Sequence, residues 1–167
     1  MSFLQTILHP LAPIYNAQSK ILILGTMPSP KSREAGFYYA HPQNRFWPIL
    51  STLLCRPLPT TNEERTQLCL SHHIALWDVL HSCQIKGADD ASIRSAQPND
   101  LLPLLKAAPI SAVFTNGSKA TALYKRHCYP HTKIEAHPLP STSPANCRYH
   151  TFETLIEAYR VLLPYLF

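Results

Sequence analysis

Two segments of the sequence gather side chains that could contact a polyanion. Residues 26–44 combine small hydroxyls, cations and aromatic rings, namely Thr26, Ser29, Lys31, Ser32, Arg33, Tyr38, Tyr39, His41 and Asn44. Aromatic faces stack on nucleic-acid bases, while hydroxyls and cations hold phosphate groups. The composition of this segment therefore favours contact with a nucleic acid.

The second segment is the run L-P-S-T-S-P-A-N at residues 139–146, which is stiffened by two prolines. Hydroxyls beside a helix start form a seat for an anion. We expect Ser141 and Ser143 to hold a phosphate. Thr142 or Pro144 would then press into a duplex as a compact wedge. The alternative interpretation is that this Ser-Pro pattern only caps the last helix.

Other kinds of site are disfavoured because their patterns are missing. The sequence has neither G-x-G-x-x-G nor G-x-x-x-x-G-K-[ST], so dinucleotide and P-loop nucleotide sites are not supported. Its five cysteines are scattered and form no C-x-x-C pair, which favours free thiols over a zinc or iron–sulfur site. We therefore expect neither a metal nor a cofactor.

The chain carries a formal net charge of +5, and the positive excess is concentrated in two stretches. Residues 1–61 and residues 111–152 each hold five basic side chains and one acidic side chain. Residues 62–110 hold four basic and six acidic side chains. If the two basic stretches meet in the fold, their field would attract a polyanion. A solubility role for the charge is the alternative.

No segment of the sequence indicates a membrane or an export route. No run approaches the roughly 18 apolar residues of a membrane helix, and the start M-S-F-L-Q-T-I-L-H-P lacks the features of a signal peptide. We expect a cytoplasmic protein, associated with the nucleoid if it is bacterial. We also expect a monomer.

The elements that must position these segments follow an alternating order. The length of 167 residues favours one domain over residues 1–167, since domains usually span roughly 100 to 200 residues. Short apolar runs predict strands, and amphipathic patterns predict helices between them. The predicted strands are residues 20–25, 74–80, 110–116 and 132–139; the predicted helices are residues 45–54, 60–72, 98–107, 117–128 and 148–163.

This order predicts an α/β fold with a mostly parallel sheet covered on both faces. Residues 81–97 are polar and irregular, so we expect a loop there and no hairpin. Ligands of such sheets bind beyond the carboxyl ends of the strands. The segments at 26–44, 117–119 and 140–146 follow predicted strands and are therefore the candidate site.

Five motifs in chain order resemble the hypoxanthine-DNA (deoxyinosine) glycosylases, a branch of the uracil-DNA glycosylase superfamily. The sequence has I-L-I-L-G-T-M-P-S-P-K-S-R-E-A-G-F-Y-Y-A-H-P-Q-N-R-F-W from Ile21, and L-P-S-T-S-P-A-N from Leu139. Between them lie I-A-L-W-D-V-L, Q-P-N-D and T-N-G. The resemblance covers nearly the whole chain, and the two long motifs are its specific part.

The resemblance implies a three-layer α/β/α fold around a four-stranded, mostly parallel sheet. It also implies hydrolysis of the N-glycosidic bond of a deaminated base in DNA, without metal or cofactor. Mismatch-specific uracil glycosylases, which share A-H-P-x-N-R-F-W, have a catalytic Asn where this chain has Met27. A thioether cannot orient water. The position that matches the catalytic Asn of the hypoxanthine branch is Asn44.

The resemblance further assigns Tyr39 as the aromatic residue that stacks on the flipped base. We place Thr26, Met27 and Asn116 with it as base-binding residues. We expect the DNA itself to be contacted by Ser29, His41, Lys119, Ser141, Thr142 and Ser143.

Several of these residues have simpler interpretations that stay open. Asn44 could cap the helix that follows it, and Tyr39 could be ordinary packing. Glu34 and the pair Asp89 and Asp90 are interpreted as solvated loop groups, so a mechanism with paired carboxylates has little support. The alternative functions are a glycosylase for uracil or for several deaminated bases, and a DNA-binding module without catalysis, which Met27 favours.

Overall fold

A four-stranded parallel sheet with the order β3–β2–β6–β7 forms the centre of the computed structural model, which describes residues 4–167. Its strands are β2 (Ile21–Gly25), β3 (Ile74–Asp78), β6 (Ala112–Asn116) and β7 (Ala136–Leu139). In register, Gly25 of β2 lies beside Asp78 of β3, and Asn116 of β6 lies beside Leu139 of β7. The carboxyl ends of all four strands therefore meet at one edge, as the sequence predicts for the site.

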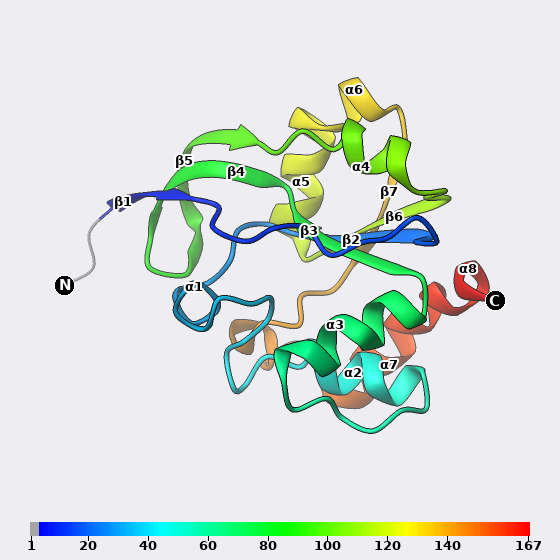
Figure 1. The fold of residues 1–167 in the computed structure, drawn as a ribbon. Helices are drawn as coiled ribbons and strands as arrows, with labels where there is room; N and C mark the ends of the chain where they lie inside the picture. Colours follow the sequence, from blue (N-terminus) through cyan, green and yellow to red (C-terminus); the bar gives the residue numbers. More distant parts are fainter. Residues whose placement is uncertain (1–3) are drawn as a thin grey trace.

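Helices cover both faces of this sheet, so the predicted three-layer α/β/α fold is confirmed (Figure 1). One face packs against α2 (Phe46–Leu53), α3 (Asn62–Ser71) and α7 (Phe152–Tyr159). The other face packs against α4 (Leu102–Ala107) and α5 (Ser118–His127). Strands buried on both sides need apolar residues at every position, which explains why β2 reads as the continuous run I-L-I-L.

The remaining helices are short. They are α1 (Pro30–Ala35), α6 (Tyr129–Thr132), η1 (Pro144–Asn146), η2 (Arg160–Leu162) and α8 (Leu163–Leu166). Helix α1 lies within the segment at residues 26–44, where no helix was predicted. Ser29 caps its start by accepting a hydrogen bond from the Ser32 amide at 3.2 Å, and Gly36 ends it in the left-handed conformation.

The prediction of an irregular loop without a hairpin at residues 81–97 is wrong. The segment forms β4 (Leu80–Lys86) and β5 (Asp89–Pro98), which pair with β1 (Leu4–Leu8) in an antiparallel sheet of order β1–β4–β5 (Figure 1). Only one face of this sheet is apolar, through residues such as Cys83, Ile85 and Ile93. Register shifts along the β4–β5 pair break the alternation of apolar and polar residues by which a strand is predicted.

Candidate active site

A cleft of about 290 Å³ lies at the carboxyl ends of the parallel strands. Ten of the predicted site residues line it: Thr26, Met27, Ser29, Tyr39, His41, Asn44, Asn116, Ser141, Thr142 and Ser143. Lys119 is not among the lining residues; it lies in the first turn of α5. The sequence therefore predicted most of one side of the cleft.

We call that side the motif wall and define it as residues 26–44 with residues 140–146. Its two segments are joined by backbone directly after Asn44, where the Arg45 amide donates to the Thr142 carbonyl at 3.1 Å. Asn116 anchors the second segment: its Oδ1 accepts from the Thr142 amide, and its Nδ2 donates to Thr142 Oγ1, both at 3.1 Å. A side-chain amide held by two hydrogen bonds has one orientation, so this wall is preorganised.

These bonds change what Thr142 can do. The residue is 0% exposed, and its hydroxyl is bonded to Asn116. The Thr142 side chain braces the loop from inside, so of the two predicted wedge residues, Thr142 and Pro144, it is the less accessible. Pro144, which is half-buried and lines the cleft, is left as the candidate for that role.

Asn44 is half-buried and lines the cleft at the start of α2. The N-cap residue of α2 is Arg45, but Asn44 Oδ1 accepts a hydrogen bond from the Phe46 amide at 2.9 Å, so Asn44 satisfies the first free amide of this helix. A carbonyl oxygen has a second lone pair, and Asn44 Nδ2 has no hydrogen-bond partner within residues 4–167. The hydrogen bond to Phe46 fixes the Asn44 side chain, while one lone pair of Oδ1 and the Nδ2 donor stay available to a ligand.

Tyr39 stands deeper, with a left-handed backbone at φ 53°. One face of its ring stacks on Phe46 at a centroid distance of 4.1 Å, so only the other face could receive a base. Its Oη is buried and has no hydrogen-bond partner among the described residues. Burial, followed by the nearby Asp78 charge, raises the pKa of this hydroxyl well above its usual value. The nearby Asn116 side chain opposes this rise in pKa, but no described group meets the geometry of a hydrogen bond to the hydroxyl. Tyr39 is therefore a neutral group.

The sequence analysis missed Asp78, which lines the same cleft from the end of β3. Its Oδ2 lies 2.7 Å from His9 Nε2, and the two side chains are 5% and 2% exposed. His9 Nδ1 accepts a hydrogen bond from the Leu11 amide, which places the ring proton on Nε2, facing the carboxylate. A carboxylate inside the otherwise apolar predicted strand at residues 74–80 was the available signal, but its partner lies 69 residues away.

Gly25 allows Asp78 and Tyr39 to approach the floor of the cleft. A Cβ at position 25 would lie 2.4 Å from Asp78 Oδ1 and 3.2 Å from Tyr39 Oη. The first distance is far below van der Waals contact, so only a glycine fits here without displacement of its neighbours.

The opposite side of the cleft is the hairpin wall, which we define by Ile85, Gly87, Ala88 and Asp90 near the β4–β5 turn. The prediction that Asp90 is a solvated loop group is wrong in part: the residue is exposed, but it belongs to a strand and lines the cleft. Although the residue as a whole is exposed, its carboxyl has lost part of its solvent in the cleft, and this raises its pKa. The charge of Lys119 lowers that pKa, and the charges of Asp89 and Asp78 raise it.

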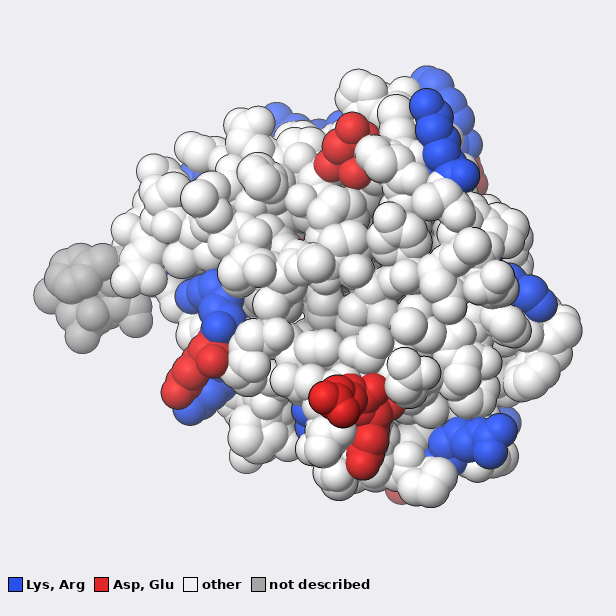
Figure 2. All heavy atoms as spheres, viewed as in Figure 1, with Lys and Arg blue, Asp and Glu red and all other residues white. Residues whose placement is uncertain are grey.

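The charge inside the cleft is therefore negative. Asp78 and Asp90 are its two carboxylate residues, and neither Lys nor Arg is among the described residues that line it. The face shown in Figure 2 is mostly uncharged, with cations scattered toward its edge and no continuous basic band. The two basic stretches of the sequence contribute the motif wall, but their cations lie outside the cleft.

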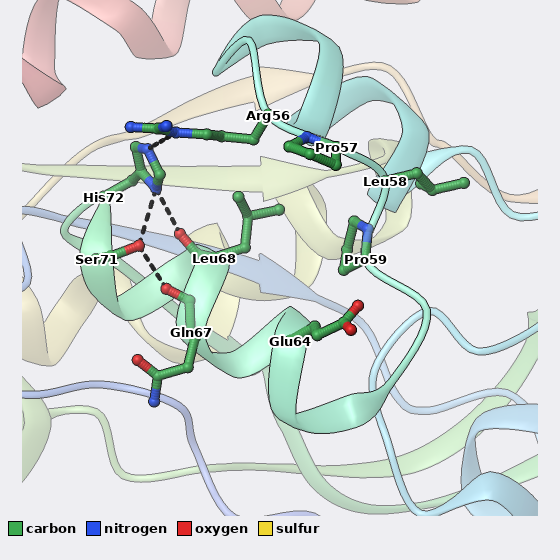
Figure 3. A pocket seen from close by; sticks show the side chains of 9 residues that line it. All are labelled: Arg56, Pro57, Leu58, Pro59, Glu64, Gln67, Leu68, Ser71 and His72. Atoms are coloured by element: carbon green, nitrogen blue, oxygen red, sulfur yellow. Dashed lines mark hydrogen bonds between the residues drawn. The ribbon is translucent and has the colours of Figure 1, made fainter.

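A larger cavity, of about 500 Å³, lies between the segment at residues 56–59 and α3 (Figure 3). His72 in this cavity contacts Arg56, Ser71 and the Leu68 carbonyl, and Glu64 accepts from Thr60. Its polar groups are thus largely paired with one another. The smaller cleft is the better candidate because it lies at the strand ends and holds polar groups without partners.

Comparison with known proteins agrees with this fold. The model of the uracil DNA glycosylase superfamily matches residues 12–163. The chain belongs to this superfamily. It is 32% identical to the hypoxanthine DNA glycosylase of Methanosarcina acetivorans over 141 residues, which cover 81% of this chain and 86% of the relative.

A second relative and a solved structure extend the comparison. The hypoxanthine DNA glycosylase of Methanosarcina barkeri is 32% identical over 110 residues, or 65% of this chain and 70% of that protein. The solution NMR structure of a uracil DNA glycosylase-like protein from Methanosarcina acetivorans matches with a TM-score of 0.77 at 27% identity. It covers 92% of this chain and 96% of the other.

Proposed function

We propose that the protein is a monofunctional DNA glycosylase that hydrolyses the N-glycosidic bond of a deaminated base, with hypoxanthine as the preferred base. Membership of the uracil DNA glycosylase superfamily and two relatives named hypoxanthine DNA glycosylase support this. The observation that carries the proposal is the cleft itself, where Asn44 and Tyr39 lie together at the ends of the parallel strands.

The target nucleotide would leave the duplex and place its base in the cleft. Unstacking costs a few kcal/mol, and less for a mispaired base such as hypoxanthine. Stacking on the free face of Tyr39 offsets about 1 to 3 kcal/mol of that cost. Thr26, Met27 and Asn116 would complete the base pocket; Asn116 would act mainly by holding Thr142 in place.

Asn44 would orient the attacking water. Because its Oδ1 already holds the start of α2, the remaining lone pair accepts a hydrogen bond from water without movement of the side chain. The bond between C1′ of the sugar and the base breaks, and its electron pair leaves with the base. The water oxygen bonds to C1′ and loses a proton, and the base gains a proton at a ring nitrogen.

The flanking DNA would contact the rim of the cleft. Ser29, His41, Ser141 and Ser143 line it and offer hydroxyl and imidazole groups to phosphates. Lys119 lies outside the lining, so its contact would be with a phosphate farther from the reacting sugar. We further propose a monomeric enzyme that needs no metal and acts in the cytoplasm on chromosomal DNA. Full activity in EDTA, and a monomer mass in light scattering, are the expected results.

The test is bond cleavage in duplexes that carry a single deoxyinosine, deoxyuridine or deoxyxanthosine, followed by alkali to break the chain at abasic sites. We expect cleavage of the deoxyinosine strand to be fastest. Faster release of uracil would favour the uracil enzyme instead. Salt-sensitive binding of all three duplexes without any cleavage would leave the non-catalytic module as the function.

A further inference from the structure

The residues of the cleft can be divided into a buried floor and an exposed mouth. Tyr39 Oη is fully buried, and Asp78, Asn116 and Thr26 are also buried, so these groups form the floor. Asp90 is exposed, so it lies at the mouth. A flipped nucleotide enters with its base first, because the sugar stays attached to the DNA chain outside. The floor therefore faces the base, while the mouth faces the deoxyribose.

The two carboxylates of the cleft differ in whether they already have a hydrogen-bond or ion-pair partner. Asp78 is held by His9 at 2.7 Å and belongs to the floor. The carboxylate of Asp90 has no hydrogen bond and no ion pair within the part of the chain that the structure describes. Its neighbour Asp89 accepts from the Ala91 amide at 3.1 Å and does not line the cleft. Asp90 is thus the uncommitted negative charge at the mouth.

Glycosidic cleavage creates positive charge on the sugar ring at C1′ and O4′. A fixed charge of opposite sign, placed where that charge develops, lowers the barrier. No Lys or Arg is among the described residues that line the cleft, so no positive side chain there would cancel this stabilisation. Given the glycosylase function proposed above, we propose that Asp90 faces the deoxyribose of the extruded nucleotide and stabilises the cation that forms as the base departs.

Asp90 forms no covalent bond in this step. The electron pair of the C1′–N bond leaves with the base, water supplies the new oxygen on C1′, and the carboxylate stays ionised throughout. Three charged groups act on it, namely Lys119 of α5, Asp78 of β3 and the adjacent Asp89. Lys119, placed beside the cleft rather than in it, helps to keep Asp90 ionised.

The experiment measures single-turnover cleavage of a deoxyinosine duplex at saturating enzyme by wild type, Asp90→Asn, Asp90→Glu and the control Asp89→Asn. Asp90→Asn should lower the rate about tenfold, while Asp90→Glu recovers most of the activity. Asp89→Asn keeps the oxygen that accepts from Ala91 and should cleave at the wild-type rate. DNA affinity of Asp90→Asn should stay equal or increase, because one negative charge near the phosphates is removed.

The pH profile separates this electrostatic role from a structural one. Because a raised pKa makes Asp90 protonate earlier as the pH falls, the wild-type rate should decline on acidification, and Asp90→Asn should lose that decline. A rate for Asp90→Asn within twofold of wild type would overturn the proposal. So would a loss of DNA affinity at an unchanged rate. Wild-type cleavage of deoxyinosine in the same series tests the glycosylase function separately.

Discussion

The two walls of the cleft are built on different principles. The motif wall is joined to the parallel sheet by the Asn116–Thr142 pair, and its two segments are joined to each other by the backbone bond from Arg45 to Thr142. The hairpin wall is held by an antiparallel ladder with register shifts, over an apolar underside formed by Cys83 and Ile85. A rigid wall suits groups whose orientation matters, such as Asn44. The charge of Asp90 at the mouth acts over a longer distance, so its position need not be fixed as closely.

The largest expected effect lies at the base of the motif wall, where Gly25→Ala should destabilise the fold by about 3 kcal/mol. The new methyl would lie 2.4 Å from Asp78 Oδ1, which cannot move freely because Oδ2 is bonded to His9. Thermal or urea unfolding measures the change. Unchanged stability together with normal deoxyinosine cleavage would mean that the floor adapts easily.

Within the motif wall, Thr142→Val should cost about 2 kcal/mol of stability, because Asn116 Nδ2 loses its buried acceptor. Valine has nearly the same shape as threonine, so no cavity forms. The loss of stability therefore measures the hydrogen bond between Asn116 and Thr142. Ser143→Ala at a half-buried position nearby is the comparison and should change stability by less than about 0.5 kcal/mol. Equal effects of the two changes would argue against the Asn116–Thr142 brace.

Asn44→Ala should slow single-turnover cleavage at least about tenfold, which corresponds to about 1.4 kcal/mol of barrier. It also removes the cap on Phe46 and should cost about 1 kcal/mol of stability. Asn44→Ser separates the two roles, since serine caps well but is too short to reach the same water. We expect Asn44→Ser to keep stability and lose activity; recovery of both would reduce Asn44 to a cap.

The smallest effect should come from the hairpin wall, where Gly87→Ala repeats the Gly25 change in open surroundings. No atom lies within 4 Å of the added methyl, so only the left-handed backbone at φ 59° is strained. We expect a loss of about 1 kcal/mol in unfolding experiments. A loss as large as that of Gly25→Ala would show that the hairpin wall is as constrained as the motif wall.

The difference between the walls also explains which parts of the site were predictable. Tyr39, Asn44 and Ser141 lie in continuous motifs that follow predicted strands, and all three line the cleft. Asp90 was interpreted as solvated because residues 81–97 show no regular alternation. Register shifts of the β4–β5 pair remove that signal, and β1, which completes the sheet, lies more than 70 residues away in the chain.

The local sequence determined the parallel sheet, because strands buried on both faces need unbroken apolar runs, and it determined the helix starts, because caps depend on neighbouring residues. Only the tertiary structure decided which partner, if any, each polar side chain of the cleft has. Asp78 is bound by His9 from a distant segment, Thr142 is turned inward onto Asn116, and the Asp90 carboxylate has no partner among residues 4–167. Such pairings depend on distances between remote segments, which only the packed chain fixes.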